Sequence, residues 1–265
     1  MATISYHRPG SIAEAARLAA ADPDARVIAG GQSMLPAMKL GLLMPSAFID
    51  LAGLAELRSI RAEGGRVSIG AMVTHAAVAE SREIRATLPA LSELAEGIGD
   101  AQVRNRGTIG GSVANSDPAA DYPAAVLALN ATIRTNQRAI AADAFFKGLF
   151  ETELKPGELV TTIELPVPTR ATYVKFPQPA SRFALVGVFV AQTDGRVRVA
   201  VTGAAAHAFR LEALEEALAR RFVPEACDAV TMAAQGLNGD LHGSAEYRAS
   251  LIRVLARRAV QRLIG

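Results

Sequence analysis

Two pairs of adjacent glycines, each flanked by hydroxyl-bearing residues, constrain the fold of this 265-residue chain more than any other feature of its sequence. The first pair lies in residues 29–33, AGGQS, directly after a short apolar run that is expected to form a strand. The second lies in residues 108–112, TIGGS. Glycine lets the backbone approach an anion closely, and free N–H groups in such turns bind phosphate oxygens. Together the two segments suit a ligand with two phosphates; taken alone, the first is equally compatible with a plain strand–turn–helix junction.

The residue inventory excludes several common kinds of site. Neither glycine segment has the G-x-G-x-x-G spacing of a Rossmann nucleotide site, and neither continues into the Gly-Lys-Ser/Thr of a Walker A loop. The single cysteine, Cys227, excludes an internal disulfide, a Cys-rich zinc site and an iron–sulfur cluster ligated within this chain. The four histidines lack metal-ligand spacing, and a net charge of +2 argues against a nucleic-acid partner.

Periodicity predicts a chain of the α+β class, with helices and strands mixed but partly segregated. The expected helices cover residues 11–21, 33–40, 74–80, 88–96, 122–130, 211–221, 224–235 and 247–263. The expected strands cover residues 26–29, 47–51, 66–69, 131–135, 158–165, 173–176, 183–192 and 196–202, and the last three of these read as an antiparallel meander. Residues 97–111 are expected to form a segment punctuated by glycines. Pro166 and Pro168 predict a split in the chain near residues 169–172.

The opening residues and the apolar runs indicate where the protein works. Residues 1–11 contain no apolar stretch of the kind found in signal peptides, so no signal peptide is expected. The longest apolar run, residues 183–191, is far too short for a membrane span. A single cysteine fits a reducing compartment. We therefore expect a cytoplasmic protein with no stable membrane insertion.

Longer stretches around both glycine segments resemble one family closely. Residues 29–40 read AGGQSMLPAMKL, and residues 98–111 read IGDAQVRNRGTIGG, continuing as SVANSDPAADYPAAVLALNA. They resemble the FAD-binding medium subunit of molybdenum hydroxylases, within the xanthine dehydrogenase family and nearest to the aerobic carbon monoxide dehydrogenase type. Residues 6–11, 69–75 and 173–187 fit the same family. The resemblance therefore covers essentially the whole chain.

The resemblance implies a fold and a set of cofactor contacts. Members of the family have a vanillyl-alcohol-oxidase-like (PCMH-type) FAD-binding fold of two α/β subdomains plus a C-terminal antiparallel sheet-and-helix domain. On this chain the three parts would be residues 1–55, 56–170 and 171–265. FAD would bind non-covalently, in an extended form. The resemblance places its contacts on Ala29, Gly30, Gly31, Gln32, Ser33, Thr108, Ile109, Gly110, Gly111, Ser112, Asp121, Leu159, Lys175 and Phe183.

Several of these positions carry a specific expectation. The glycine segments would hold the pyrophosphate, Leu159 would contact the cofactor from a strand, and Lys175 would lie near the flavin ring. Asp121 has two interpretations, either as the N-cap of the helix that follows it or as an acceptor for the adenosine part of FAD. Phe183 stands where relatives often have a tyrosine beside the isoalloxazine, so it keeps the ring face without the hydroxyl. Gln32 replaces a histidine of some relatives and still offers hydrogen-bond donors.

The resemblance also implies a role and partners. The FAD of such a subunit takes electrons from two [2Fe-2S] clusters of a small subunit, after a large molybdenum-cofactor subunit has oxidised the substrate, and passes them to an external acceptor. The expected assembly is a dimer of heterotrimers. The single cysteine agrees, because the clusters then have to lie on another chain. No catalytic acid or base and no metal ligand is expected here, because the cofactor performs the chemistry.

Two other functions compete with this interpretation. One is a self-sufficient flavin-dependent oxidase or dehydrogenase of the same fold class, which would need its own substrate domain and base. The other is a nucleotide-binding assembly or scaffold protein without a redox role. The sequence leaves the substrate of the complex open among carbon monoxide, a purine, an aldehyde and an N-heterocycle, because the substrate binds another subunit. The electron acceptor is equally open.

Overall fold

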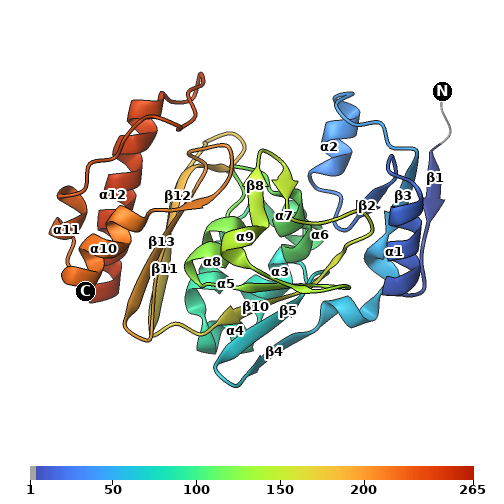
Figure 1. The fold of residues 1–265 in the computed structure, drawn as a ribbon, viewed down its shortest axis with the longest axis horizontal. Coiled ribbons are helices and arrows are strands. Elements are labelled where there is room, and N and C mark those ends of the chain that lie inside the picture. Colours follow the sequence, from blue (N-terminus) through green and yellow to red (C-terminus); the bar gives the residue numbers. More distant parts are fainter. Residues whose placement is uncertain (1–3) are drawn as a thin grey trace.

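The computed structural model describes residues 4–265, which form sheets of three, five, four and two strands with helices packed against them. Figure 1 shows the three-stranded sheet and the C-terminal helices at opposite ends of the long axis, with the five-stranded sheet and its helices between them. Strands and helices are mixed along the chain, and most helices precede or follow a run of strands. The predicted α+β class is confirmed.

The N-terminal sheet is parallel and has the strand order β1-β3-β2. It consists of β1 (Ser5–His7), β2 (Arg26–Ile28) and β3 (Ala47–Asp50), with α1 (Ile12–Ala21) and α2 (Met34–Lys39) in its connections. Helix α1 begins after Ser11, whose side chain accepts a hydrogen bond from the Glu14 N–H. The Glu14 carboxylate accepts from the Gly10 N–H, one residue earlier than in a full capping box. Two short 3₁₀ turns, Leu51–Gly53 and Ala55–Arg58, lead on to the middle sheet.

The middle sheet is antiparallel, with the order β4-β5-β10-β6-β7. Its strands are β4 (Ile60–Glu63), β5 (Arg66–Gly70), β6 (Thr132–Thr135), β7 (Ala139–Ala141) and β10 (Val160–Pro166). Between β5 and β6 run α3 (His75–Glu80), α4 (Arg82–Thr87), α5 (Pro89–Glu96), α6 (Ala101–Arg106), α7 (Ile109–Asn115) and α8 (Tyr122–Ala128). Helix α9 (Ala142–Phe145) and the hairpin β8 (Phe146–Gly148) and β9 (Glu151–Thr152) precede β10. Apolar side chains of the sheet, including Ile69, Ile133 and Ile163, pack with these helices in the largest core cluster.

The C-terminal sheet is the predicted antiparallel meander. It consists of β11 (Arg170–Pro177), β12 (Ala184–Thr193), β13 (Arg196–Thr202) and the short β14 (Phe209–Arg210). Helices α10 (Glu212–Arg220) and α12 (Ala245–Ile264) cover its outer face, and α5 and α8 cover its inner face (Figure 1). Because both faces are covered, residues 184–191 of β12 are all buried, and they read as a continuous apolar run. No helix within residues 4–265 is both long and apolar enough to cross a membrane.

Two regions differ from the expected secondary structure. The helix expected over residues 224–235 is a single turn, α11 (Glu225–Asp228). Beyond it the chain is a loop, and Asn238 holds that loop in place by donating from its N–H and its side chain to the carbonyls of Ala204 and Ala205. Residues 97–111 are also not simply a glycine-rich loop, because they contain α6 and the start of α7. The second glycine segment is therefore the first turn of a helix.

The basic face of α12 is not wholly solvated. Its first turn carries Arg248, which is 3% exposed. The Arg248 guanidinium donates to the main-chain oxygens of Leu185 (2.7 Å) and Gly203 (2.8 Å) and forms an ion pair with Asp240 (2.7 Å). Arg248 is therefore not a solvated side chain, and it fastens the helix to the ends of β12 and β13.

We predict that Arg248→Leu lowers the free energy of unfolding by about 3 kcal/mol, because two buried carbonyls and one carboxylate lose their charged donor. The matched control is Arg253→Leu on the exposed face of the same helix, which should change stability by less than about 0.5 kcal/mol. Denaturant titration of both variants measures the difference. Equal stabilities would show that Arg248 does not fasten the helix.

Candidate functional site

A cavity of about 450 Å³ opens between the N-terminal sheet, the helices α6 and α7, and the loop of residues 178–183. Both glycine segments line it, although they lie far apart in the sequence. The predicted site residues that line it are Ala29, Gly30, Gly31, Gln32, Ser33, Thr108, Gly110, Gly111, Ser112, Asp121, Leu159 and Phe183. Ile109 and Lys175 lie outside it, Ile109 as a fully buried core residue.

Glycines of both segments pack directly against other parts of the chain. A Cβ added to Gly30 would lie 2.0 Å from the main-chain oxygen of Arg106. A Cβ added to Gly110 would lie 2.4 Å from the Cβ of Ala71. Gly31 has φ +73°, a backbone conformation that residues with a Cβ atom rarely adopt. Glycine is therefore required at these positions by contacts within the protein, before any ligand is considered.

The two segments differ in the donors that they leave free. The N–H groups of residues 30–33 donate to no acceptor in the described part of the chain, so they are available to a ligand. In the second segment the N–H groups of Ile109, Gly110 and Gly111 are used, donating to Val73, to Ala71 and to the Thr108 hydroxyl. Only the first segment therefore has free N–H groups that can bind an anion. The second contributes the Ser112 hydroxyl and a closely packed wall.

Asp121 is a buried carboxylate on the cavity wall. Its backbone is already helical, with φ −77° and ψ −44°, and its side chain caps no N–H group, so its expected role as an N-cap is wrong. Instead it accepts from the Tyr173 hydroxyl at 2.6 Å and pairs with Lys175 Nζ at 3.0 Å. Burial raises the pKa of Asp121, and the Lys175 charge and the Tyr173 hydrogen bond oppose that shift.

Lys175 lies behind Asp121, away from the cavity. Besides pairing with Asp121, its ammonium group donates to the carbonyls of Gly97 (2.8 Å) and Arg182 (3.2 Å), which accounts for its three N–H bonds. It thereby joins β11 to the loop before α6 and to the loop of residues 178–183. That second loop carries Phe183, whose half-exposed ring lines the cavity. Lys175 itself is not among the residues that line the cavity.

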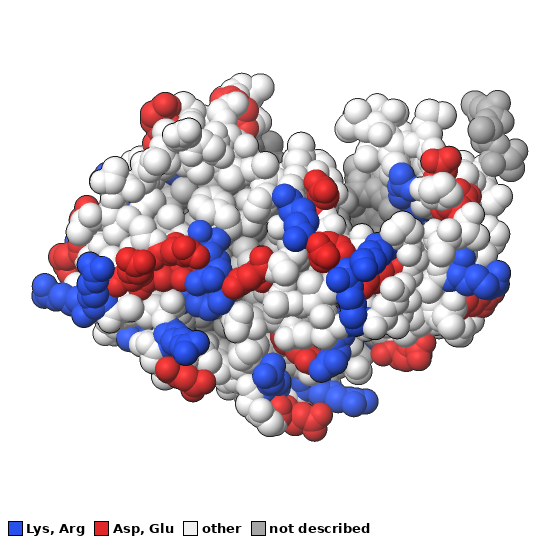
Figure 2. All heavy atoms as spheres, in the orientation of Figure 1, with Lys and Arg blue, Asp and Glu red and all other residues white. Residues whose placement is uncertain are grey.

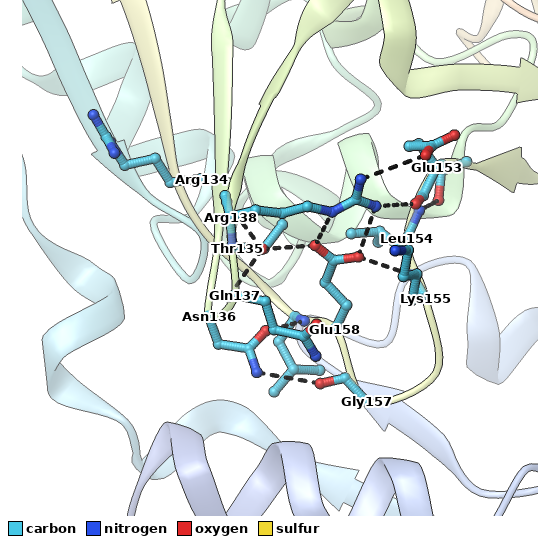
Figure 3. Close-up of polar contacts among 12 residues, drawn as sticks. Arg134, Thr135, Asn136, Gln137, Arg138, Glu153, Leu154, Lys155, Gly157 and Glu158 are labelled. Atoms are coloured by element: carbon cyan, nitrogen blue, oxygen red, sulfur yellow. Dashed lines mark hydrogen bonds and ion pairs between the residues drawn. The ribbon is translucent and has the colours of Figure 1, made fainter.

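A second buried carboxylate, Glu158, was not predicted from the sequence. Figure 3 shows it enclosed by polar groups of the β6–β7 hairpin and the loop before β10. It accepts from Arg138 Nε (2.9 Å) and Nη2 (3.1 Å), from the Thr135 hydroxyl (2.8 Å) and from the Lys155 N–H (2.9 Å). Because these bonds favour the charged form, chiefly the bond from Arg138, the pKa of Glu158 falls to about 2.

This network fixes the position of Leu159 on the cavity wall. The N–H of Leu159 donates to Asn136 Oδ1 (2.8 Å), and its carbonyl accepts from the Asn136 N–H (3.0 Å). Asn136 also donates from its amide to the carbonyl of Gly157 (3.2 Å; Figure 3). A charged residue immediately before an apolar strand was the available signal, but its side-chain partners Thr135 and Arg138 lie 23 and 20 residues earlier in the chain.

Other ionisable groups offer little chemistry at this site. Among the described residues, no three His, Cys, Asp or Glu side chains gather closely enough to hold a metal ion. Cys227 is buried in the C-terminal core, and burial raises the pKa of its thiol to about 11. Figure 2 shows acidic and basic side chains interspersed over the face of the molecule that it presents. The lining of the cavity also includes hydroxyl groups and main-chain N–H groups.

The low pKa of Glu158 predicts a pH-dependent stability. Its pKa is lowered on folding from 4.5 to about 2, so its contribution is complete above the unfolded value and is lost as the pH falls through the folded one. After allowance for the partly exposed guanidinium of Arg138, the contribution should be about 2 kcal/mol. We expect the stability difference between the native chain and Glu158→Gln, measured by denaturant titration, to shrink between pH 6 and pH 3. Glu151→Gln, at an exposed carboxylate, is the control; a difference independent of pH would contradict the assignment.

Comparison with known families and proteins agrees with this geometry. Residues 2–168 match the family described as FAD binding domain in molybdopterin dehydrogenase, and residues 171–263 match the CO dehydrogenase flavoprotein C-terminal domain. The chain is 37% identical to the nicotine 6-hydroxylase medium subunit of Paenarthrobacter nicotinovorans, over 97% of this chain and 96% of that protein. It is 36% identical to the carbon monoxide dehydrogenase medium chain of Hydrogenophaga pseudoflava, over 96% of this chain and 95% of that protein.

The fold matches solved structures equally well. A chain in the structure of reconstituted CO dehydrogenase from Oligotropha carboxidovorans superposes with a TM-score of 0.91 and 35% identity, covering 98% of this chain and 97% of that chain. The predicted PCMH-type FAD-binding fold is thereby confirmed. The relatives are subunits of oxidoreductases. This chain belongs to the family of FAD-binding medium subunits of molybdenum hydroxylases, as the resemblance in its sequence predicted.

Proposed function

We propose that this chain binds FAD non-covalently in the cavity, as the electron-transfer subunit of a heteromeric molybdenum hydroxylase. The observation that carries the placement is the set of N–H groups at residues 30–33, which belong to residues lining the cavity and have no partner in the described chain. Ser112, which carries a hydroxyl, lines the same cavity. Free N–H groups and hydroxyls of this kind suit a pyrophosphate.

The remaining walls suit the rest of the cofactor. Apolar groups such as Met72, Ile98 and Leu159 line the cavity and offer surface for an aromatic ring system. Phe183 supplies a ring face at the loop of residues 178–183. Asp121 is the carboxylate that we assign to the adenosine part. Lys175 acts on the cofactor through Asp121 and the loops that it joins, and is a positioning residue.

Bound FAD would accept two electrons and release them to an external acceptor. The chain's own residues bind the cofactor and set its surroundings. With one cysteine, the chain holds no cysteine-ligated iron–sulfur cluster of its own, which supports two [2Fe-2S] clusters on a small subunit and a molybdenum cofactor on a large subunit. The medium-subunit names of the relatives support such partners. We propose a dimer of heterotrimers, located in the cytoplasm.

We retain the division of the chain into residues 1–55, 56–170 and 171–265. The parallel sheet, the five-stranded sheet and the C-terminal meander fall into these three stretches. The two family matches meet between residues 168 and 171, which supports the second boundary. We propose that the large subunit determines the substrate. Two relatives with nearly the same sequence identity to this chain have names that refer to compounds as different as nicotine and carbon monoxide.

We predict that Gly30→Ala lowers the FAD affinity by at least about tenfold, because its Cβ would collide with the Arg106 carbonyl and push the free N–H groups out of place. Gly239→Ala is the control, since its Cβ would meet no atom closer than 3.8 Å. The measurement is the flavin absorbance per polypeptide of the purified chains. Normal flavin content in Gly30→Ala would refute the placement of the pyrophosphate.

Mild affinity purification from the native host tests the role in a complex. We expect FAD together with a large molybdenum-containing subunit and a small iron–sulfur subunit. Recovery of the chain alone with FAD and with substrate turnover would instead identify a self-sufficient flavoenzyme. Recovery of the folded chain without flavin would favour a scaffold role and would overturn the proposal.

A further inference from the structure

Two buried polar atoms beside the cavity have no hydrogen-bond partner in the described part of the chain. They are Nδ1 of His75 and the hydroxyl of Tyr122. His75 is the first residue of α3 and Tyr122 is the first residue of α8. Their rings are neighbours, with centroids 5.3 Å apart and planes inclined at 45°. Because an unpartnered buried polar group costs about 1–3 kcal/mol, two of them on adjacent rings need an explanation.

His75 belongs to the cavity wall at the place where the glycine segments meet. Its residue is 5% exposed and lines the cavity together with Gly107. A Cβ added to Gly107 would lie 2.5 Å from His75 Nε2, so this ring nitrogen is beside Gly107. Gly107 in turn borders Gly30, whose added Cβ would lie 2.8 Å from the Gly107 Cα. The imidazole edge that carries Nε2 is therefore next to the proposed pyrophosphate site.

The protonation states of both rings follow from their burial. Burial, helped by the charge of Arg104, lowers the pKa of His75 to about 4, so the imidazole is neutral at pH 7 and has one N–H. Burial and the neighbouring Asp121 raise the pKa of Tyr122 well above its usual value. The phenol therefore keeps its proton, and that proton needs an acceptor.

One tautomer of His75 satisfies both unpartnered groups. If Nδ1 is unprotonated, it can accept from the Tyr122 hydroxyl of the neighbouring ring, through one buried water or after a side-chain rotation. If Nδ1 carries the proton, it cannot accept, and the hydroxyl hydrogen has no acceptor in the described chain. The first arrangement leaves the N–H of His75 on Nε2, at the cavity wall.

We propose that His75 is a cofactor-binding residue whose neutral Nε2–H, held in that tautomer by Tyr122, donates a hydrogen bond to an acceptor oxygen of FAD in the cavity. The proposal rests on the proposed function. It assigns to Tyr122 the role of a positioning residue, because its hydroxyl acts on the cofactor through His75. It also explains why a histidine is buried here without a partner: the partner of Nε2 is the ligand, and the partner of Nδ1 is the tyrosine.

Nitrogen-15 NMR of the labelled full chain tests the tautomer directly. The His75 signals are assigned by their disappearance in His75→Leu. We expect an unprotonated Nδ1 and a protonated Nε2 without FAD, and a shift centred on the Nε2–H when FAD is added. A proton on Nδ1, a doubly protonated ring, or an Nε2 signal unmoved by bound FAD would overturn the proposal.

Titration of the apo chain with FAD tests the hydrogen bond. His75→Leu should weaken binding about tenfold, and His75→Gln, which keeps an N–H at a similar reach, should recover most of that loss. Tyr122→Phe should weaken it about threefold. Because leucine also leaves the Tyr122 hydroxyl without its acceptor, a lower thermal midpoint of the apo His75→Leu chain is expected in either case. The FAD affinity of the folded variants separates the two roles: recovery of affinity in His75→Gln supports the hydrogen bond, and equal affinities of His75→Gln and His75→Leu would indicate a purely structural role. Failure of the native chain to bind FAD would refute the proposed function, whereas equal affinities of the native and leucine chains would refute only the role of His75.

Discussion

The cavity exists because a strand end and a helix end can touch at Gly30 without an intervening side chain. The Gly30 backbone lies so close to Arg106 and Gly107 that even a methyl group would overlap the Arg106 carbonyl. This contact brings the N-terminal sheet against α6 and α7, which belong to the layer of helices on the middle sheet. With a wider separation, the free N–H groups of residues 30–33 would face water instead of a shared cavity. The site is thus a consequence of backbone packing between two parts of the chain.

Two buried carboxylates that are bonded to other parts of the protein hold the other walls. Glu158 ties the loop before β10 to the β6–β7 hairpin, and Asp121 ties α8 to β11. The Asp121 bond in turn requires Gly187 on β12, since a Cβ there would lie 2.2 Å from the Tyr173 hydroxyl. Because a buried charge with satisfied hydrogen bonds is costly to displace, these anchors fix the walls before a ligand arrives. The polar groups near the cavity that have no partner within the protein are then those free to form hydrogen bonds with the proposed cofactor.

The sequence predicted the elements whose pattern is local. The strand expected over residues 183–192 and the helix expected over residues 11–21 form as β12 and α1, close to those bounds. The sequence failed where contacts with residues far along the chain determine the local structure. A loop replaces most of the helix expected over residues 224–235, and it is held by carbonyls more than thirty residues away. Asp121 bonds to Tyr173 and Lys175 and does not cap its helix. Short elements such as β4 and α4 were missed because they contain too few residues to show a recognisable periodic pattern of apolar side chains. For the site, most of the residues that the resemblance named line one cavity, and Ile109 and Lys175 do not. Glu158 offered only its position before an apolar strand as a signal, and His75 carried no signal of its own.

The two glycine segments look equivalent as sequence patterns, yet hydrogen-bond accounting separates them. In the second segment every N–H from Ile109 to Ser112 is already bonded within the protein, so its glycines serve the fit of α7 against Ala71 and Ala29. In the first, the same count leaves residues 30–33 with free donors. Both segments are necessary to a phosphate site, one because it donates and the other because it permits the approach. A glycine motif therefore indicates where two segments of the chain approach closely, whereas unpaired N–H donors indicate where a ligand can be held.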